Sequence, residues 1–324
     1  MRRPIALVII AAAMLLAPIA VTGPAQAKVP GPNGQIVFSR HDNTLDLNYI
    51  YLVNPDGSQL RPLSFPFDMD VPHWSPDGTK IAFNSGLNLC PPTCVGHTVI
   101  IDPDTGDYRI LQPPDPNMFT SCTLWSPDAT HFACDGASDS DPSRNGMYTI
   151  RSSDGGDLTR ITDAGGGHDV PIDYSPDGNQ IVFGRFGPDG ECTKKSALYV
   201  VNVNGSGLRQ ITPPGFCDED GSWSPDGSKI AFEHRGSIFT VHPDGTGLAQ
   251  IPLKTSSPSY AGDISWSPDG TKMAFILFLH TGPNTFEEGI GTANADGAGV
   301  QQITLAPSGF RDHQADWGPH PLAT

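Results

Sequence analysis

The sequence lacks long apolar runs, an excess of positive charge and the common catalytic motifs. After the first 30 of its 324 residues, no stretch stays apolar for long enough to cross a bilayer. Its 19 Lys and Arg face 35 Asp and Glu, so we expect no nucleic-acid partner. It contains no Gly-x-Ser-x-Gly elbow and no His-Glu-x-x-His zinc motif. We therefore assign no catalytic residue.

The single long apolar run lies at the N-terminus, in residues 5–21. Two arginines precede it, and the small residues 25–27 follow it. This order is typical of a secretory signal peptide, so we assign residues 1–27 to it and residues 28–324 to the exported domain. A membrane anchor is the alternative, which Pro18 and the small residues disfavour.

Without residues 1–27, the domain has 17 basic against 35 acidic residues, a formal charge of −18. This balance fits a soluble monomer that is secreted or retained in the periplasm or cell envelope. It also favours a cationic ligand or a divalent cation at a focused site. No resident cofactor is otherwise expected.

The chain contains a repeat, whose clearest copy is residues 74–83. There Trp-Ser-Pro-Asp-Gly precedes Thr-Lys-Ile-Ala-Phe. Pro presets the turn, Asp can bond its own backbone, and Gly accepts a positive φ, so a tight hairpin is predicted. An isolated hairpin is marginally stable, and the copies must therefore stack. The aromatic position recurs at Trp74, Trp125, Tyr174, Trp223, Trp266 and Trp317.

The repeat spacing predicts a β-propeller. The aromatic positions are 51, 49, 49, 43 and 51 residues apart, which is long enough for four strands per unit. Each hairpin is followed by a second turn, as at residues 242–245, and by a short strand ending in Ile-Thr or Leu-Thr, as at residues 211–212. We predict an all-β fold of six four-stranded antiparallel blades, with strands A to D in each.

The hairpin and the second turn resemble the repeat of TolB-like β-propellers, a WD-repeat-like family related to the propellers of prolyl oligopeptidases. The resemblance covers nearly all of the chain after residue 30. It extends neither to the α/β domain that precedes the TolB propeller nor to a hydrolase domain. It therefore implies a fold more strongly than a function.

The two ends of the repeat are incomplete in complementary ways. Residues 32–38 form a turn and a B strand without an A strand, and residues 316–319 form an A strand without a B strand. We predict that they pair and close the ring. The six B strands should then begin near Gln35, Lys80, His131, Gln180, Lys229 and Lys272.

This strand order sorts the connections onto two faces. The A to B and C to D turns are short and repetitive, and form what we call the regular face. The B to C and D to A connections form the irregular face, with long loops expected at residues 84–96, 135–146, 184–195 and about 278–289. We expect function on the irregular face, because loops on a rigid scaffold often carry binding. Sequence drift on an unused surface is the alternative.

The six cysteines are predicted to form three disulfides at the irregular face. An even count in an exported chain favours disulfides over metal thiolates or free thiols. Cys122 and Cys134 flank the third hairpin symmetrically. Among fifteen pairings we choose Cys122 with Cys134, Cys90 with Cys94, and Cys192 with Cys217.

Charged residues that open the A strands should surround the mouth of the central channel. They are Asp68, Asp70, His168, Asp169, Asp218, Glu219, Asp220, Asp263, Arg311, Asp312 and His313. Arg40, Arg185 and Arg235 end nearby B strands. These residues could bind a polar ligand or a cation. Alternatively, the carboxylates are solvated or paired with the arginines.

Other acidic residues are predicted to be structural. Asp77, Asp226 and Asp269 should form turns. Residues 135–145 fail the calcium-loop pattern because Arg144 stands where Gly is needed, so we predict a solvated loop. The repeat aromatics should form the core between blades.

Two functions of different class remain open. The first is a binding or scaffolding propeller that recognises a protein, peptide or glycan through the irregular face. The second is a metal-dependent carbohydrate-active enzyme, a lyase or hydrolase, since some oligogalacturonate lyases resemble this repeat family and use propeller histidines with a metal. His168, His313 and Gln314 would be the candidate metal ligands. We favour binding, because no catalytic set is recognisable.

Overall fold

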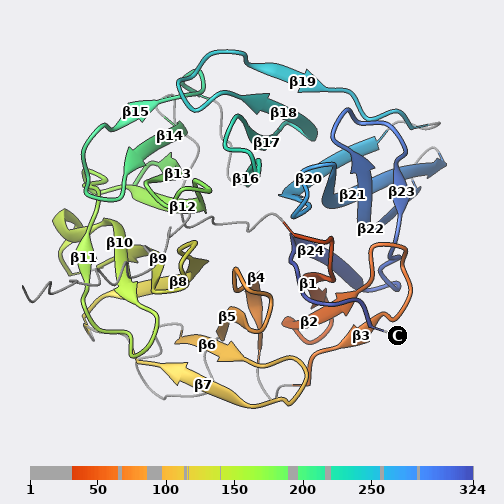
Figure 1. The fold of residues 1–324 in the computed structure, drawn as a ribbon, viewed down its shortest axis with the longest axis horizontal. Helices are drawn as coiled ribbons and strands as arrows, with labels where there is room; N and C mark the ends of the chain where they lie inside the picture. The colour runs from red at the N-terminus through yellow and green to blue at the C-terminus, as the bar shows by residue number, and fades with distance from the viewer. Residues whose placement is uncertain are drawn as a thin grey trace, which may run out of the picture.

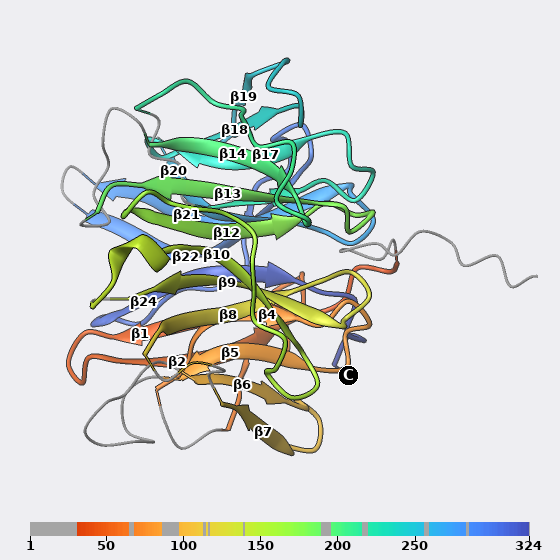
Figure 2. The same cartoon turned by 90° about the vertical axis from the view of Figure 1, so that its left-hand side faces the viewer.

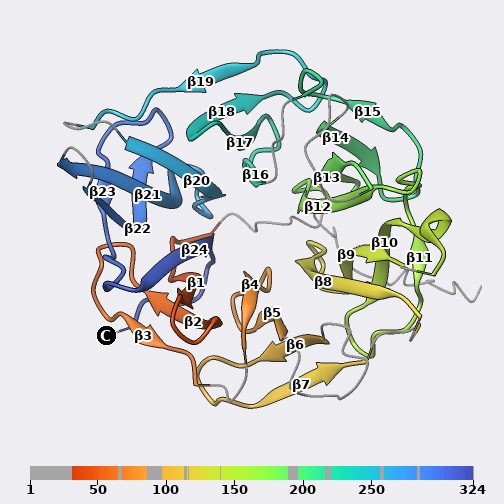
Figure 3. The same ribbon diagram turned by 180° about the vertical axis from the view of Figure 1, so that it is seen from behind.

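The structure is a computed structural model that describes residues 31–64, 68–85, 97–112, 115, 117–138, 140–188, 196–215, 220–255, 259–282 and 285–323. In these ranges the chain forms 24 strands and one 3-10 helix, η1 (Pro142–Arg144). The strands form six four-stranded antiparallel sheets around a central axis (Figures 1 and 3). The predicted six-bladed propeller is confirmed. The predicted signal peptide lies outside the described residues, and none of the described residues forms a helix long and apolar enough to span a membrane.

Each blade uses its strands A to D in the same order, from the axis outwards. Blade one contains β24 (Phe310–Trp317), β1 (Ile36–Asp42), β2 (Leu47–Val53) and β3 (Arg61–Pro62). Blade two contains β4 (Asp70–Trp74), β5 (Ile81–Ser85), β6 (His97–Ile101) and β7 (Tyr108–Leu111). Blade three contains β8 (Phe119–Trp125), β9 (His131–Ala137), β10 (Gly146–Arg151) and β11 (Thr159–Arg160). Blade four contains β12 (His168–Tyr174), β13 (Gln180–Phe186), β14 (Ala197–Asn202) and β15 (Arg209–Gln210). Blade five contains β16 (Gly221–Trp223), β17 (Ile230–His234), β18 (Ser237–Val241) and β19 (Ala249–Ile251). Blade six contains β20 (Ser259–Trp266), β21 (Lys272–Gly282), β22 (Thr285–Asn294) and β23 (Gln301–Gln302).

The A to B turns form as their sequence predicts. Asp77 Oδ1 accepts hydrogen bonds from the Ser75 hydroxyl at 2.6 Å and from the Thr79 N–H at 3.0 Å. Gly78 has a φ of +70°, and a Cβ there would lie 2.7 Å from the His320 backbone nitrogen. The predicted role of the hairpin aspartates as turn formers is confirmed. The same contacts recur at Asp128, Asp177, Asp226 and Asp269.

The hydrophobic core lies between neighbouring blades. All six repeat aromatics are buried, the most exposed being Trp125 at 7%. Trp74 packs in one cluster with Ile50 and Leu52 of blade one, which shows how adjacent blades share a core. Burial of these large side chains is the main source of ring stability. Five B strands add a fully buried phenylalanine at one equivalent position, namely Phe38, Phe83, Phe183, Phe232 and Phe275.

Blade three has a disulfide where the other five blades have that phenylalanine. Cys134 occupies the equivalent position of β9 and is bonded to Cys122 of β8. Both cysteines are buried. The predicted pairing of Cys122 with Cys134 is confirmed, and the other two predicted disulfides lie outside the described residues.

The ends of the chain close the ring in blade one. β24 pairs with β1 so that Trp317 lies opposite Ile36, and Figures 1 and 3 show the blue and red strands side by side. The residues after β24 continue the contact, since the Gln35 N–H donates to the His320 carbonyl at 2.9 Å. The His320 ring also stacks on Trp74 of blade two, with ring centroids 4.7 Å apart. The predicted closure is confirmed.

Figure 2 shows the ring edge-on, so that the regular and irregular faces lie at opposite sides of the view. One predicted loop was wrong: within it, residues 278–282 and 285–289 form strand, because β21 continues to Gly282 and β22 begins at Thr285. The physical reason is that backbone pairing between β21 and β22 continues through these residues, and β20 also pairs with β21 as far as Leu279. Blade five also departs from the long-loop pattern, because a two-residue turn, Arg235 and Gly236, joins β17 to β18.

Candidate functional site

The A strands of all six blades surround a central channel. Between β4, β8, β12, β16, β20 and β24 lies a cavity of about 340 Å³. Each of these strands begins at the irregular face and ends at a hairpin turn of the regular face. Residues from every blade line the cavity, and its size falls in the range of ligand sites.

The channel wall contains strained backbone. Five of the six A strands carry a bulge or register shift where they face the channel. Val71, Asp263 and Gln314, each three residues before the aromatic of its blade, have φ values of +52°, +48° and +53°. A β-branched residue such as Val71 is a clear outlier in this left-handed region. Such strain persists only where the surroundings enforce it, and it is concentrated at functional sites.

Hydrogen bonds across blade boundaries hold these strained residues. The Gln314 N–H donates to Asp263 Oδ2 at 2.6 Å, and the Val71 N–H donates to Gln314 Oε1 at 3.0 Å. The three bulges of blades six, one and two are thus linked in sequence around the channel. Gln314 uses its side-chain oxygen for this link.

A second set of channel residues, which sequence analysis missed, stands directly before the repeat aromatics. Asp316 Oδ2 accepts a hydrogen bond from the Trp74 N–H at 2.9 Å, and Asp173 Oδ2 accepts one from the Trp223 N–H at 2.7 Å. Each carboxylate therefore fixes the A strand of the next blade. A recurring polar residue at this repeat position was the available signal, at Asp173, Ser222, Ser265 and Asp316.

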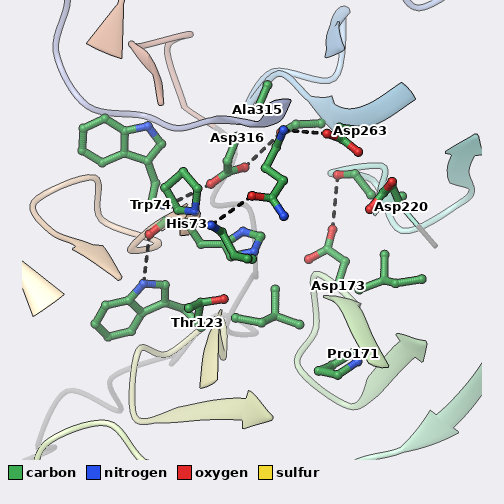
Figure 4. Close-up of a pocket in the computed structure, with 18 of the residues that line it drawn as sticks. His73, Trp74, Thr123, Pro171, Asp173, Asp220, Asp263, Ala315 and Asp316 are labelled. Carbon is green, nitrogen blue, oxygen red and sulfur yellow. Dashed lines mark hydrogen bonds between the residues drawn. The ribbon is translucent and has the colours of Figure 1, made fainter. Parts of the chain in front are cut away.

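The channel wall is acidic. Asp220 and Asp263, which were predicted, line it together with Asp135, Asp173 and Asp316 (Figure 4). Among the described residues that line the cavity there is no Lys and no Arg. Carboxylates in a concave site with low-dielectric walls focus a negative potential, which attracts cationic groups.

His168 lies at the edge of this wall, beside Asp135. The His168 Nδ1 is 3.7 Å from Asp135 Oδ2, and this neighbouring carboxylate raises the pKa of His168. Asp135 belongs to β9, which continues to Ala137. The predicted solvated loop was therefore wrong at its first residues, because pairing with β8 and β10 extends the strand to them.

A polar cluster spans the seam between blades one and two on the irregular side. Asn48 Oδ1 lies 3.1 Å from both His41 Nδ1 and His313 Nε2. His313 Nδ1 is 4.0 Å from Asp70 Oδ1, a buried atom that accepts no hydrogen bond from a described residue. Burial raises the pKa of Asp70, and the nearby His313 opposes this shift. The ionised form of Asp70 therefore destabilises the fold.

Four predicted site residues form buried ion pairs away from the cavity. Arg40 donates to both oxygens of Asp312 at 2.6 and 2.8 Å, and Arg185 donates to both oxygens of Asp169 at 2.7 Å. Thr304 and Thr162, each from the preceding blade, donate to these carboxylates. For these residues the alternative interpretation, pairing of acids with arginines, is correct.

The remaining predicted residues are dispersed. Arg311 and Arg235 are exposed, and Arg235 forms no ion pair with any residue that the structure describes. Asp68 Oδ1 accepts a hydrogen bond from the Asn48 N–H at 2.6 Å. Asp218 and Glu219 lie outside the described residues.

The candidate metal ligands lie apart. His168 belongs to blade four and His313 to blade one, which are opposite blades of a six-membered ring. No three His, Cys, Asp or Glu side chains within the described ranges are grouped so that they could hold a metal ion. Gln314 is hydrogen-bonded to Val71, as described above.

No family model matches the sequence, and a curated relative is similar to part of it. An uncharacterized protein of Agrobacterium fabrum, Atu1656, is 30% identical over 172 residues. This match covers 52% of the present chain and 52% of that protein, so the chain spans about half the length of this relative.

Solved structures share the propeller more completely. TolB from Acinetobacter baumannii matches with a TM-score of 0.66 and 17% identity, over 88% of this chain and 66% of that one. A candidate TolB from Agrobacterium tumefaciens matches with a TM-score of 0.61 and 17% identity, over 89% and 100%. An oligogalacturonate lyase in complex with manganese matches with a TM-score of 0.54 and 14% identity, over 84% and 74%. The chain thus has the six-bladed fold of TolB and TolB-like propellers.

Proposed function

We propose that this protein is a binding or scaffolding module that recognises a protein or peptide at the irregular mouth of its channel. The observation that carries the proposal is the acidic, strained channel wall, in which Asp263 and Val71 hold left-handed backbone beside a cavity of about 340 Å³. Structure that costs stability is retained where it serves binding. A cationic side chain of the partner would complement the carboxylates.

We further propose that the protein acts outside the cytoplasm, in the periplasm, the cell envelope or the medium. The buried disulfide between Cys122 and Cys134 supports this, since disulfides persist in oxidising compartments. The N-terminal residues 1–27, interpreted as a signal peptide, agree with it.

Affinity capture from an envelope extract tests the binding function. The full chain is compared with Asp263→Asn at the irregular mouth and with Tyr108→Ala, an exposed residue near the regular face. We expect a set of proteins that is captured by the full chain and by Tyr108→Ala and weakened by Asp263→Asn. Equal capture by all three, with both variants folded, would refute a role for the mouth.

A metal-dependent carbohydrate-active enzyme is the second candidate, favoured by the similarity to the oligogalacturonate lyase that binds manganese. Metal analysis of the purified protein separates the two functions. Stoichiometric metal that is lost in His168→Ala would support the enzyme. A folded protein that takes up no Mn²⁺ during dialysis would support binding alone.

A further inference from the structure

The irregular side of blade six is extended by additional strand. β21 has 11 residues, whereas the equivalent B strands of the other blades have 5 or 7. β20 pairs with this extension as far as Ser259, opposite Leu279. The additional part forms a three-stranded end of the blade, which we call the blade-six tip. It consists of Ser259 and Tyr260 of β20, residues 278–282 of β21 and residues 285–288 of β22.

Aromatic side chains gather on one face of the blade-six tip. Tyr260 lies opposite Phe278, and His280 lies opposite Phe286, so strand alternation places all four on the same face. The His280 ring centroid is 5.8 Å from that of Tyr260 and 4.1 Å from that of Phe286. Tyr260 is 48% exposed and Phe286 is 53% exposed. Exposed aromatic clusters of this kind commonly mark interaction sites.

The outer edge of β22 is open beside these rings. The chain after β23 covers the edge as far as Glu288, where the Ala306 N–H donates to the Glu288 carbonyl at 2.8 Å. Pro307 follows and cannot continue the ladder. By alternation, the next groups that point outwards are the N–H and C=O of Phe286. No residue in the described part of the chain pairs with them, so an extended segment could add here.

The charges around the tip favour a basic partner. Glu288 lies opposite Phe278, so it is on the aromatic face, where it is half-buried, whereas the exposed Glu287 is on the other face. Burial raises the pKa of Glu288, and Arg311 only partly offsets this effect. An added cation would stabilise the carboxylate. The whole chain is also acidic, with a formal charge of −16.

We propose that the blade-six tip docks an extended segment of a partner protein, in which an aromatic or large aliphatic side chain stands next to Lys or Arg. The apolar side chain would pack on Tyr260 and Phe286, and the cation would meet Glu288. This proposal depends on the proposed binding function and names the anchor and the partner chemistry.

One other occupant fits the tip less well. A second copy of this chain would bring two strongly acidic surfaces together, which like-charge repulsion opposes.

A phage-displayed library of random 12-residue peptides, selected on the full chain, tests the proposal. We expect enriched peptides to combine an aromatic or large aliphatic residue with Lys or Arg. Synthetic versions of these peptides should lose about tenfold or more in affinity, measured by fluorescence anisotropy, for Tyr260→Ala and for Phe286→Ala. Glu288→Gln should weaken binding less and reduce its salt dependence.

Two matched variants control for residue type and exposure. Tyr108 is 50% exposed in β7, near the regular face, and Phe119 is 44% exposed at the start of β8, on the irregular face of blade three. Tyr108→Ala and Phe119→Ala should bind the peptides as the full chain does. Circular dichroism and thermal melting of every variant confirm that it is folded.

The outcomes separate this proposal from the proposed function. If Phe119→Ala abolishes peptide binding and Phe286→Ala does not, the irregular face still binds but the tip is not the anchor. If only Tyr108→Ala weakens binding, both proposals are wrong. Enrichment of acidic peptides, or sedimentation showing a dimer that Phe286→Ala dissolves, would overturn the assignment of a basic partner segment.

Discussion

Carboxylates with opposite pKa shifts lie at the two ends of the ring. At the regular face, the Ser224 hydroxyl lowers the pKa of Asp226, and the Thr246 hydroxyl lowers the pKa of Asp244. At the irregular face, burial raises the pKa of Asp70 and of Glu288. Asp226 and Asp244 therefore stabilise the fold, whereas the ionised forms of Asp70 and Glu288 cost stability. This contrast is expected when one end builds the scaffold and the other serves binding.

The closing strand should show the largest effect, because it belongs to the scaffold. Deleting the last ten residues removes Trp317 with its pairing to Ile36, and His320 with its stacking on Trp74. We expect loss of cooperative unfolding, measured by circular dichroism during heating. A truncated chain that melts cooperatively at the temperature of the full chain would contradict the closure.

Removing the buried ion pair of blade one should have the second-largest effect on stability. Asp312→Ala leaves the Arg40 guanidinium buried without its partner, which typically costs about 3–5 kcal/mol. Urea unfolding measures the difference from the full chain. Asp46→Asn is the control, because Asn also tolerates the φ of +55° at this position, and the contact of the 97% exposed Asp46 with His41 should be worth no more than about 0.5 kcal/mol. Equal effects of the two variants would show that the buried pair is not needed.

The same turn chemistry can be compared at both ends. At the regular end, Asp226 accepts hydrogen bonds from the Ser224 hydroxyl and the Ser228 N–H. At the irregular end, Asp141, the residue before η1, accepts hydrogen bonds from the N–H and the hydroxyl of Ser143. We expect Asp226→Ala to cost about 1 kcal/mol in urea unfolding. Asp141→Ala should cost clearly less, because its loop on the irregular side can loosen without opening a blade. A larger loss for Asp141→Ala would reverse the comparison.

Asp70→Asn should give the smallest effect, and it should stabilise the fold, whereas the other substitutions destabilise it. The pKa of Asp70 is raised above 3.8, so its ionised form destabilises the fold at pH 7, and this cost disappears as the pH falls through the raised value. The variant should be more stable at pH 7, by about 1 kcal/mol or less, because solvent reaches 34% of the side chain. Its advantage should vanish near pH 3.

The measurement is urea unfolding of both proteins at pH 7 and pH 3. Asp226→Ala is the matched comparison, because the lowered pKa of Asp226 means that its contribution persists at pH 7 and is lost at low pH. If Asp70→Asn is less stable at pH 7, the attraction of His313 outweighs the burial of Asp70, and the irregular end is not strained there.

Much of the scaffold could be predicted from sequence because each repeat encodes its own local structure. Pro76, Asp77 and Gly78 specify a hairpin through φ preferences and short-range hydrogen bonds. Cys122 and Cys134 could be paired because they lie at equal distances from one turn. The blade-six tip was mistaken for a loop, since only its backbone pairing between β20, β21 and β22 shows that its residues are strand residues.

The site was predicted only in part, because its residues converge from different blades. Asp70, Asp263 and His313 were identified from their place at the start of A strands, whereas Asp173 and Asp316 were missed. Arg40 and Asp312 lie 272 residues apart, and sequence could not tell a buried pair from a ligand site.

By itself, the sequence determined six blades, a closed ring, the buried aromatics and the turn aspartates, because each follows from a pattern that recurs along the chain or from the number and completeness of the repeats. Only the tertiary structure decided which charged residues are paired, which line the channel and which aromatic residues remain exposed. Those properties depend on how neighbouring blades meet, and the strain at Val71 and the open face at Phe286 arise from that packing.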